Sequence, residues 1–234
     1  MTGPLYAAVL DRAGVTSGTR LLDLGCGRGE FAAAAVARGA VVTGIDIDPA
    51  AVAAVAVEGT FSVGDAHDPP DGPFDVAAAV QLLGHVRNPV LVLRRAGAVA
   101  SVVAVAVWGR DEECDVRAFG EALAAWLPPP RPAGGPPPVT EPARLARLVE
   151  LAGLRVDSVD EVVCPFDYPS ADELVGPVLA AGIGRAAARA AGPAAVRTAV
   201  LERCATFRTA DGGYRLNNLF RVLVAQRRRD RHTY

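Results

Sequence analysis

The sequence contains no lysine, so its fixed positive charge comes from arginine alone. Lysine and arginine together number 24 against 26 acidic residues, which leaves a formal net charge of −2. Proteins that bind DNA or RNA usually carry an excess of basic residues, because contacts to the phosphate backbone supply much of the affinity. The charge balance therefore argues against a nucleic-acid partner.

Long apolar runs are also missing, although apolar residues make up 51% of the chain. No run approaches the ~18 consecutive apolar residues of a membrane span. The sequence does not begin with a basic segment followed by an apolar one, as a secretory signal would. We therefore expect a cytoplasmic protein without a membrane partner.

Cysteine and histidine are scarce, and they are not spaced as disulfide frameworks or metal sites require. The four cysteines are far apart, no Cys-x-x-Cys pair occurs, and no histidine stands at metal-ligand spacing from them. We expect reduced thiols and no metal site. These residues are Cys26, Cys114, Cys164 and Cys204.

The most informative stretch that is present runs from Leu21 to Ala32 and reads LLDLGCGRGEFA. Alternating glycines between a strand and a helix let the backbone approach a ligand closely, and the helix N-terminus behind them offers free N–H groups. This indicates a nucleotide-like ligand. Asp23 precedes the glycines and would repel a pyrophosphate, whereas it suits an ammonium group. The spacing also differs from the G-x-G-x-x-G of dinucleotide sites, which disfavours NAD.

Strand-like and helix-like segments alternate over the first half of the chain, which is typical of an α/β fold with a parallel sheet. Asp48-Pro49 and Asn88-Pro89 each read as a helix N-cap followed by proline at the first helical position. We expect strands near 20–24, 41–45, 60–63, 74–80 and 101–108, and helices near 28–38, 49–57 and 88–97.

The second half departs from this regular alternation. We expect a helix at 115–127, a proline-rich loop at 128–138, a helix at 141–152, a strand at 154–163, helices broken by glycine over 170–206, and a last strand from Tyr214 to Gln226. The whole pattern predicts a Rossmann-like, seven-stranded and mostly parallel sheet with helices on both faces. A helical cap or insert lies between strands six and seven.

The second predicted strand ends at Asp46, 21 residues beyond Gly25. In dinucleotide-binding folds a carboxylate at about this spacing accepts hydrogen bonds from ribose hydroxyls. Ile47 follows and would offer an apolar face to a base. The third strand is followed by Gly64-Asp65-Ala66, which by itself is a common turn sequence.

The motif Asp-x-Gly-x-Gly-x-Gly at the end of the first strand resembles motif I of the class I S-adenosylmethionine-dependent methyltransferases. The ordered motifs cover about residues 1–108. Within that family the chain is similar to small bacterial enzymes related to the ubiquinone and menaquinone C-methyltransferases, because Trp-Gly follows strand five and the chain closes with a Tyr-Arg-Leu-x-Asn strand. The turn before strand five, Arg95 to Ser101, departs from the family's Leu-x-Pro-Gly-Gly.

The resemblance implies S-adenosylmethionine as cofactor and S-adenosylhomocysteine as product. The glycine loop would receive the amino-acid end of the cofactor, the acid of Gly-Asp-Ala its adenine, and the end of strand four its sulfonium side, while the N-terminal helix would cover it. The implied cofactor-binding residues are Tyr6, Asp23, Gly25, Cys26, Gly27, Gly29, Asp46, Ile47, Gly64, Asp65, Ala66 and Gln81.

Residues beyond the cofactor motifs leave alternatives open. His85 is a candidate general base, because imidazole exchanges protons near neutral pH, but relatives also use this position to stabilise the loop. Trp108 and Cys114 are candidate substrate-binding residues, and each is also compatible with a place in the core. The acids 111–113 either orient an amine or begin a solvated helix. His67 is expected in a surface loop.

The sequence as a whole predicts one methyltransferase domain over 1–234, with substrate-cap elements at about 109–138 and 166–210. Both cap elements are rich in Ala, Val, Leu and Pro, which favours a small apolar or aromatic acceptor methylated on O, N or C, in secondary metabolism. The alternatives are a cofactor-binding cyclase or isomerase that does not methylate, and a cofactor-sensing module. The sequence leaves open whether the insert also forms a homodimer interface.

Overall fold

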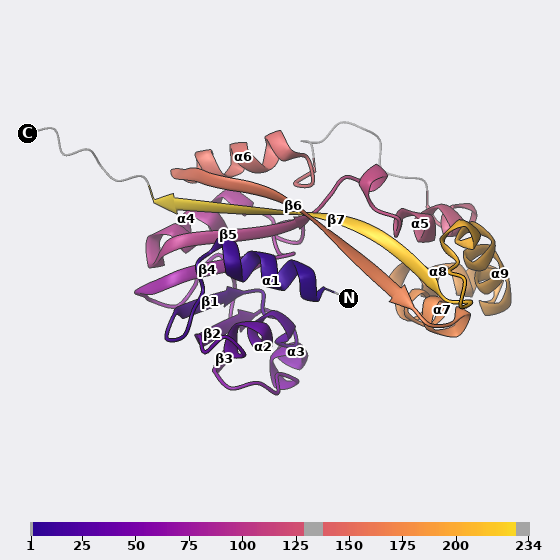
Figure 1. The fold of residues 1–234 in the computed structure, drawn as a ribbon, viewed down its shortest axis with the longest axis horizontal. Helices are drawn as coiled ribbons and strands as arrows, with labels where there is room; N and C mark the ends of the chain where they lie inside the picture. Colours follow the sequence, from indigo (N-terminus) through magenta and orange to yellow (C-terminus); the bar gives the residue numbers. More distant parts are fainter. Residues whose placement is uncertain (1, 129–137, 228–234) are drawn as a thin grey trace, which may run out of the picture. The chain divides into compact units, whose positions relative to one another are not determined.

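The computed structural model describes residues 2–128 and 138–227, and seven strands form one sheet in the order β3-β2-β1-β4-β5-β7-β6 (Figure 1). β1 pairs in parallel with β2 and β4, β2 with β3, and β4 with β5, whereas β7 runs antiparallel to β5. The predicted seven-stranded, mostly parallel sheet is confirmed. The strands are β1 Arg20–Leu24, β2 Val41–Asp46, β3 Thr60–Val63, β4 Phe74–Val80, β5 Ala100–Trp108, β6 Leu154–Tyr168 and β7 Tyr214–Arg227.

Helices precede β1, β2, β3 and β5, as the pattern predicts, whereas β4 follows β3 without a helix between them. Asp48 accepts a hydrogen bond from Ala50 N–H and Asn88 one from Leu91 N–H, so both expected N-caps are formed. These caps set where α3 and α4 begin. The helices among the first five strands are α1 Gly3–Arg12, α2 Glu30–Val36, α3 Pro49–Ala53 and α4 Pro89–Val99. A further helix, α6 Pro142–Leu151, comes before β6.

The helices expected at 28–38 and 49–57 are shorter, Glu30–Val36 and Pro49–Ala53, and two further boundaries differ for identifiable reasons. The helix expected at 115–127 begins only at Arg117, because Cys114 pairs with Asn218 in a β-bridge and Asp115 N–H donates to Asn217 O. The strand expected at 154–163 continues to Tyr168 through Pro165. β6 is an edge strand, and an edge strand tolerates proline because its outward N–H has no ladder partner to lose.

The described residues group into two compact units. The larger unit holds residues 2–108, 138–162 and 220–227, and its core contains strands β1, β4 and β5 with helices α4 and α6 packed against them. Strands β1, β4 and β5 are buried along most of their length, as strands covered on both faces are.

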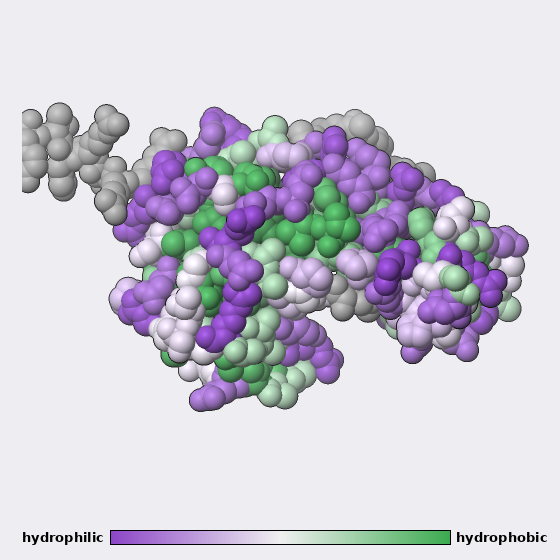
Figure 2. Space-filling view, viewed as in Figure 1, coloured by the Kyte–Doolittle hydropathy of each residue, from purple (hydrophilic) through white to green (hydrophobic). Residues whose placement is uncertain are grey.

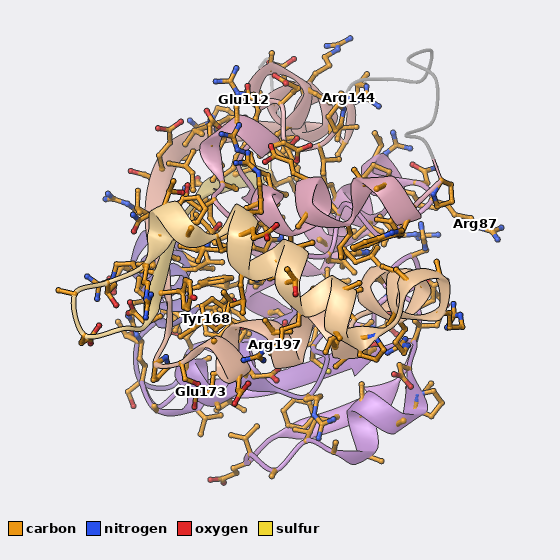
Figure 3. The ribbon with its side chains drawn as sticks, turned by 90° about the vertical axis from the view of Figure 1, so that its right-hand side faces the viewer. Arg87, Glu112, Arg144, Tyr168, Glu173 and Arg197 are labelled. Carbon is orange, nitrogen blue, oxygen red and sulfur yellow. The ribbon has the colours of Figure 1, made fainter. Side chains whose placement is uncertain are left out.

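The smaller unit holds residues 109–128 and 163–219 and has a core of its own. Its helices are α5 Arg117–Leu123, α7 Ala171–Ala180, α8 Gly182–Ala191 and α9 Pro193–Arg203. Of the glycines expected to break the helical stretch, Gly182 begins α8 and Gly192 separates α8 from α9, whereas Gly184 lies within α8. Arg197 of α9 pairs with Asp172 of α7, beside Glu173 and Tyr168 in Figure 3. This unit contains the described parts of the two segments predicted as cap elements; residues 129–137 lie outside the described residues. Their role as a cap stays a prediction.

Apolar side chains also reach the surface. In Figure 2 hydrophobic areas of the larger unit lie between hydrophilic ones, and Val41, Val63 and Leu151 are among its exposed apolar residues. Scattered exposed apolar residues are usual in folded proteins. Within the part of the chain that the structure describes, no helix combines the length and the hydropathy needed to cross a membrane.

Candidate functional site

The site begins where β1 ends, in the loop from Gly25 to Gly29 that leads into α2. Gly25 and Gly27 have φ angles of +70° and +54°, a left-handed backbone conformation that residues with a Cβ rarely adopt. At Gly25 a Cβ would also lie 2.7 Å from Leu82 Cδ1, whereas at Gly27 nothing lies within 4 Å of that position. The backbone conformation of the loop therefore depends on glycine at these positions, and the space beside Gly27 is open to a ligand.

Asp46 at the end of β2 stabilises this loop by a hydrogen bond. Its Oδ2 accepts a hydrogen bond from Gly27 N–H at 2.8 Å, and its Oδ1 accepts one from Asp48 N–H at 2.9 Å. An ionised carboxylate has about four acceptor positions, so two remain for a ligand. The next residue, Ile47, is 73% exposed, which is unusual for a large apolar side chain and suits a flat apolar ligand surface.

Asp23 lies beneath the loop and is almost fully buried, at 1% exposure. Burial raises the pKa of Asp23 to about 7, and the negative charges of Asp46 and Glu30 add to the shift. Its Oδ2 has no hydrogen-bond partner among the described residues. A buried acceptor without a partner is costly, so this oxygen favours a proton or a donor group brought by a ligand, such as an ammonium.

A second wall of the site comes from the end of β4. Gln81 has φ +56° although it carries a side chain, and its N–H donates to Ala106 O of β5 at 2.7 Å. A left-handed conformation costs an ordinary residue about 1–2 kcal/mol, and such strain gathers at functional sites. The sequence pattern predicts Gln81 as a site residue, but nothing in it indicates the strained backbone.

These segments surround a cavity of about 630 Å³ at the carboxyl ends of the parallel strands, the edge of an open α/β sheet at which ligands bind. All of the lining residues belong to the larger unit. The lining residues are Gly25, Asp46, Ile47, Gly64, Asp65, Ala66, His67, Gln81, Leu82, His85, Val86 and Arg87.

The structure thus brings together eight residues that the sequence pattern singled out: Gly25, Asp46, Ile47, Gly64, Asp65, Ala66, Gln81 and His85. Sequence reasoning missed four others in the lining, namely His67, Leu82, Val86 and Arg87. His67 was expected in a surface loop. Its place two residues after Asp65 was the signal that could have found it, because Asp side chains often bond to groups two residues on.

The remaining predicted cofactor residues lie outside the lining of this cavity. Tyr6 of α1 packs edge-on against Phe31 of α2, with ring centroids 5.6 Å apart, and burial raises its pKa. Cys26 is buried, and burial raises the pKa of its thiol to about 12, so it is an inert small side chain. The cofactor-binding roles predicted for Tyr6, Asp23, Cys26, Gly27 and Gly29 stay predictions, as do those of the predicted residues in the cavity lining.

His85 is exposed in the loop after β4, and its N–H donates to Leu82 O at 2.8 Å. Its backbone therefore closes a turn of that loop, while its side chain lines the cavity. Arg87 points away from the ribbon in Figure 3. Both readings of His85, as base and as loop residue, are compatible with this geometry.

The two predicted substrate residues belong to different units. Trp108 ends β5 in the larger unit, and the centroid of its ring lies 4.3 Å from the ring centroid of Phe220. Cys114 lies in the smaller unit, where its buried thiol contacts Leu219 O at 3.4 Å and burial raises its pKa. Substrate binding by Trp108 and Cys114 stays a prediction.

The acids 111–113 form a short 3-10 helix whose charges are partly satisfied within the chain. Arg110 pairs with Glu112 at 3.3 Å and with Glu113 at 2.8 Å. This arrangement agrees with the alternative in which these acids begin a helix, rather than orient an amine.

The geometry defines an α/β protein with a nucleotide-type ligand site, and comparison with known proteins identifies its family. Residues 4–159, more than half of the chain, match the family model described as a methyltransferase domain. The chain therefore belongs to this family, the class I S-adenosylmethionine-dependent methyltransferases.

Among curated proteins, the chain is similar to the ubiquinone biosynthesis O-methyltransferase of Pseudomonas aeruginosa. The two are 35% identical over 102 residues, which cover 39% of this chain and 44% of the relative. The match thus spans less than half of the relative's length.

Among solved structures, the fold is similar to that of the (4+2)-cyclase SpnF, with a TM-score of 0.59 and 22% identity over 95% of this chain and 80% of the other. It is also similar to the magnesium protoporphyrin IX methyltransferase of Synechocystis PCC 6803 with bound SAH, with a TM-score of 0.53 and 14% identity over 95% of this chain and 80% of the other. At these identities the likeness shows the fold.

Proposed function

We propose that this chain transfers a methyl group from S-adenosylmethionine to a small apolar or aromatic acceptor, at an oxygen, nitrogen or carbon atom. The observation that carries the proposal is the single cavity in which Gly25, Asp46, Asp65 and Gln81 come together. Membership of the methyltransferase domain family supports it.

The chain's groups fit this cofactor at each of its parts. The unpaired oxygen of Asp23 suits the ammonium group, the free acceptor positions of Asp46 suit the ribose hydroxyls, and exposed Ile47 suits the face of the adenine. The open space beside Gly27 leaves room for the amino-acid end.

Catalysis by this chain is mainly a matter of position. The bound cofactor supplies an already activated methyl group on its sulfonium, so what the protein must add is alignment of the acceptor atom with that methyl group. The hydrogen bond from Gln81 N–H to Ala106 O holds the end of β4 in its strained conformation beside the site. His85 is our candidate base for acceptors that must lose a proton, because it lines the same cavity.

The composition of the segments 109–138 and 166–210 bears on the nature of the acceptor. Ala, Val, Leu and Pro dominate these segments, which favours an apolar or aromatic acceptor over a highly charged one. The curated relative named above is a methyltransferase of ubiquinone biosynthesis. The expected role in secondary metabolism stays a prediction.

A second function is a cyclase or isomerase that binds the cofactor without consuming it, using the sulfonium as a fixed positive charge. The observation that favours it is the fold shared with a (4+2)-cyclase. We rank it second because the family model that matches is a methyltransferase domain.

One experiment separates the two functions. The purified protein is incubated with S-adenosylmethionine and a panel of phenols, amines and quinone-like compounds, and S-adenosylhomocysteine is measured together with acceptor mass. Methyl transfer predicts equal amounts of S-adenosylhomocysteine and of a product 14 mass units heavier, the mass of CH₂. Conversion of an acceptor without S-adenosylhomocysteine would overturn methyl transfer and favour the cyclase.

A further inference from the structure

Arg221 of β7 is a buried arginine in the larger unit. Its side chain is only 3% exposed, although arginine is almost never fully buried unless it is paired. Leu223 and Ala225 follow at alternate positions of the strand and belong to the hydrophobic core that also holds residues of α4 and α6. Arg221 therefore faces the same side of the sheet as this core, where burial removes the hydration of its charge.

Two hydrogen bonds connect this guanidinium to other segments. Nη2 donates to Glu161 Oε1 of β6 at 3.0 Å, and Nη1 donates to the backbone oxygen of Thr140 at 3.3 Å. Thr140 stands two residues before Pro142, the first residue of α6, and the N-terminal end of a helix disfavours a cation. Neither burial nor the helix favours arginine at this place. What Arg221 provides there is a fixed position for the chain at Thr140.

The chain segment that Arg221 holds reaches the loop after β4. Val139 precedes Thr140, and its Cγ2 lies 3.8 Å from the position that a Cβ at Gly84 would take. Such a distance means that the segment and the loop are in van der Waals contact. His85 follows Gly84 directly, and its side chain lines the cavity. The segment therefore supports the loop that forms this wall of the cavity.

The loop itself has little to hold it in place. Gly84 and His85 are both exposed, and their turn is closed by the hydrogen bond from His85 N–H to Leu82 O. Glycine adds backbone freedom, and exposed turns open more readily than buried elements do. A contact at Gly84 from another segment consequently restricts which conformations the loop adopts.

We propose that Arg221 is a positioning residue for the methyl-transfer site. It fixes the chain at Thr140, and through the contact between Val139 and Gly84 this chain holds the loop in the conformation that lines the cavity. The inference rests on the proposed function, because the loop serves the reaction only if the cavity binds S-adenosylmethionine. Arg221 is not among the residues that line the cavity, so it acts through the loop.

Two substitutions interrupt the connection at its two ends. Arg221→Met removes the guanidinium and keeps an apolar side chain of similar length. Val139→Ala removes the methyl groups that contact Gly84. Leu223→Ala is the matched control, because Leu223 lies in the same strand and core but has none of the contacts that connect Arg221 to the loop.

Two measurements report on the loop. Calorimetry gives the affinity for S-adenosylhomocysteine, and hydrogen exchange gives the protection of the His85 amide in the free protein. Arg221→Met and Val139→Ala should each weaken the affinity by about 3- to 10-fold and speed exchange at His85 by a similar factor. The double variant should be no weaker than Arg221→Met alone, because both changes act on one connection.

A purely structural role of Arg221 predicts another pattern, in which affinity falls only as stability falls. Replacing a buried ion pair by an apolar side chain is often neutral or stabilising, and Glu161 is 59% exposed, so it stays hydrated without its partner. Arg221→Met should therefore keep the urea midpoint of the wild type while it loses affinity. Leu223→Ala should do the reverse at 15 °C, with a lower urea midpoint and unchanged affinity and exchange at His85.

Three results would overturn the inference. These are unchanged affinity and exchange in Arg221→Met, additive losses in the double variant, and equal losses of affinity in Leu223→Ala. If Arg221→Met does not fold, unchanged exchange at His85 in Val139→Ala overturns it instead. Failure of the wild type to bind S-adenosylhomocysteine would overturn the proposed cofactor site, and exchange at His85 in the free protein would still test the hold on the loop.

Discussion

Asp23 combines an ionisable side chain with nearly complete burial, and it lies under the loop of the proposed cofactor site. Its pKa is raised from an ordinary 3.8 to about 7, mainly because the charged form loses its hydration. The folded protein therefore holds a proton at Asp23 over a pH range in which the unfolded chain has released it. Linkage then requires stability to fall as the pH rises through this range.

We predict that the free energy of unfolding of the wild type decreases between pH 5 and pH 7 by about 2–3 kcal/mol through Asp23 alone, since one pH unit corresponds to about 1.4 kcal/mol. Asp23→Asn should remove this slope and be the more stable protein at pH 8. Urea unfolding of both proteins at pH 5, 6, 7 and 8 measures the slope and the difference in stability.

The control for this prediction is Asp75→Asn. The Arg20 guanidinium beside Asp75 lowers the pKa of that carboxyl to about 2, so its contribution to stability is constant above about pH 4 and is lost only as the pH falls below that value. An equal slope in the wild type and in Asp23→Asn would contradict the assignment of the pH dependence to Asp23.

Asp46 accepts a hydrogen bond from the loop at Gly27 and, by our proposal, also from the ribose hydroxyls. Asp46→Ala should weaken binding of S-adenosylmethionine by about 10- to 100-fold, because it removes hydrogen bonds to a charged acceptor and frees the loop at Gly27. Titration calorimetry measures the affinity, with Asp71→Asn, an exposed acid outside the lining, as control. An affinity equal to that of the wild type would remove Asp46 from the site.

His85 should affect the reaction rather than the binding of the cofactor. We expect His85→Ala to lower kcat by about 100-fold with an acceptor that must lose a proton, since general base catalysis contributes about that much. The dissociation constant of S-adenosylmethionine should not change. Steady-state kinetics and calorimetry on the same preparation separate the two, and an unchanged kcat would leave His85 as a loop residue.

At the scale of elements, the junction between β4 and the following loop stores strain at Gln81. Glycine adopts a positive φ without strain but loses more entropy on folding than alanine, so the two effects partly offset each other. We predict that Gln81→Gly is more stable than Gln81→Ala by about 0.5–1 kcal/mol in urea unfolding. Both variants lose the side chain, so the difference reports the backbone alone.

A matched pair at Ser62 provides the control for Gln81. Ser62 is an exposed residue within β3, an ordinary strand, so Ser62→Gly should be less stable than Ser62→Ala. The same order of stability at both positions would contradict the strained conformation of Gln81.

The elements of the first half were predictable because each has local signals at its ends. Asp48 and Asn88 cap their helices as expected, and the expected strands 60–63 and 74–80 match β3 and β4. At the start of α5, by contrast, a contact from far along the chain moved the boundary. Asn217 and Asn218, about 100 residues away, hold the chain at 114–115 in strand-like pairing and delay the start of α5.

At the scale of the whole molecule, the two units have separate cores, and the cofactor cavity is lined by the larger unit alone. Leu174 is fully buried in the core of the smaller unit. Leu174→Ala should lower the free energy of unfolding by about 2–4 kcal/mol through the cavity it leaves. The affinity for S-adenosylmethionine should not change at a temperature at which the variant is folded.

The comparison for Leu174 is Leu24→Ala, an equally buried leucine that ends β1 directly before the glycine loop. We expect it to lower both stability and cofactor affinity. Urea unfolding and calorimetry at 15 °C measure the two quantities. A loss of affinity in Leu174→Ala as large as that in Leu24→Ala would show that the smaller unit takes part in cofactor binding.

The fold class, the order of the strands along the chain and the kind of ligand could be predicted from the residues alone, because these depend on local patterns. Apolar runs specify the strands, and the glycine spacing with Asp23 indicates the ligand. Three features became visible only in the folded chain: Gln81 is strained, one oxygen of Asp23 has no hydrogen-bond partner among the described residues, and His67 belongs to the cavity wall. The physical reason is that burial, strain and cavity lining arise where segments distant in sequence pack together, and no local pattern contains that packing.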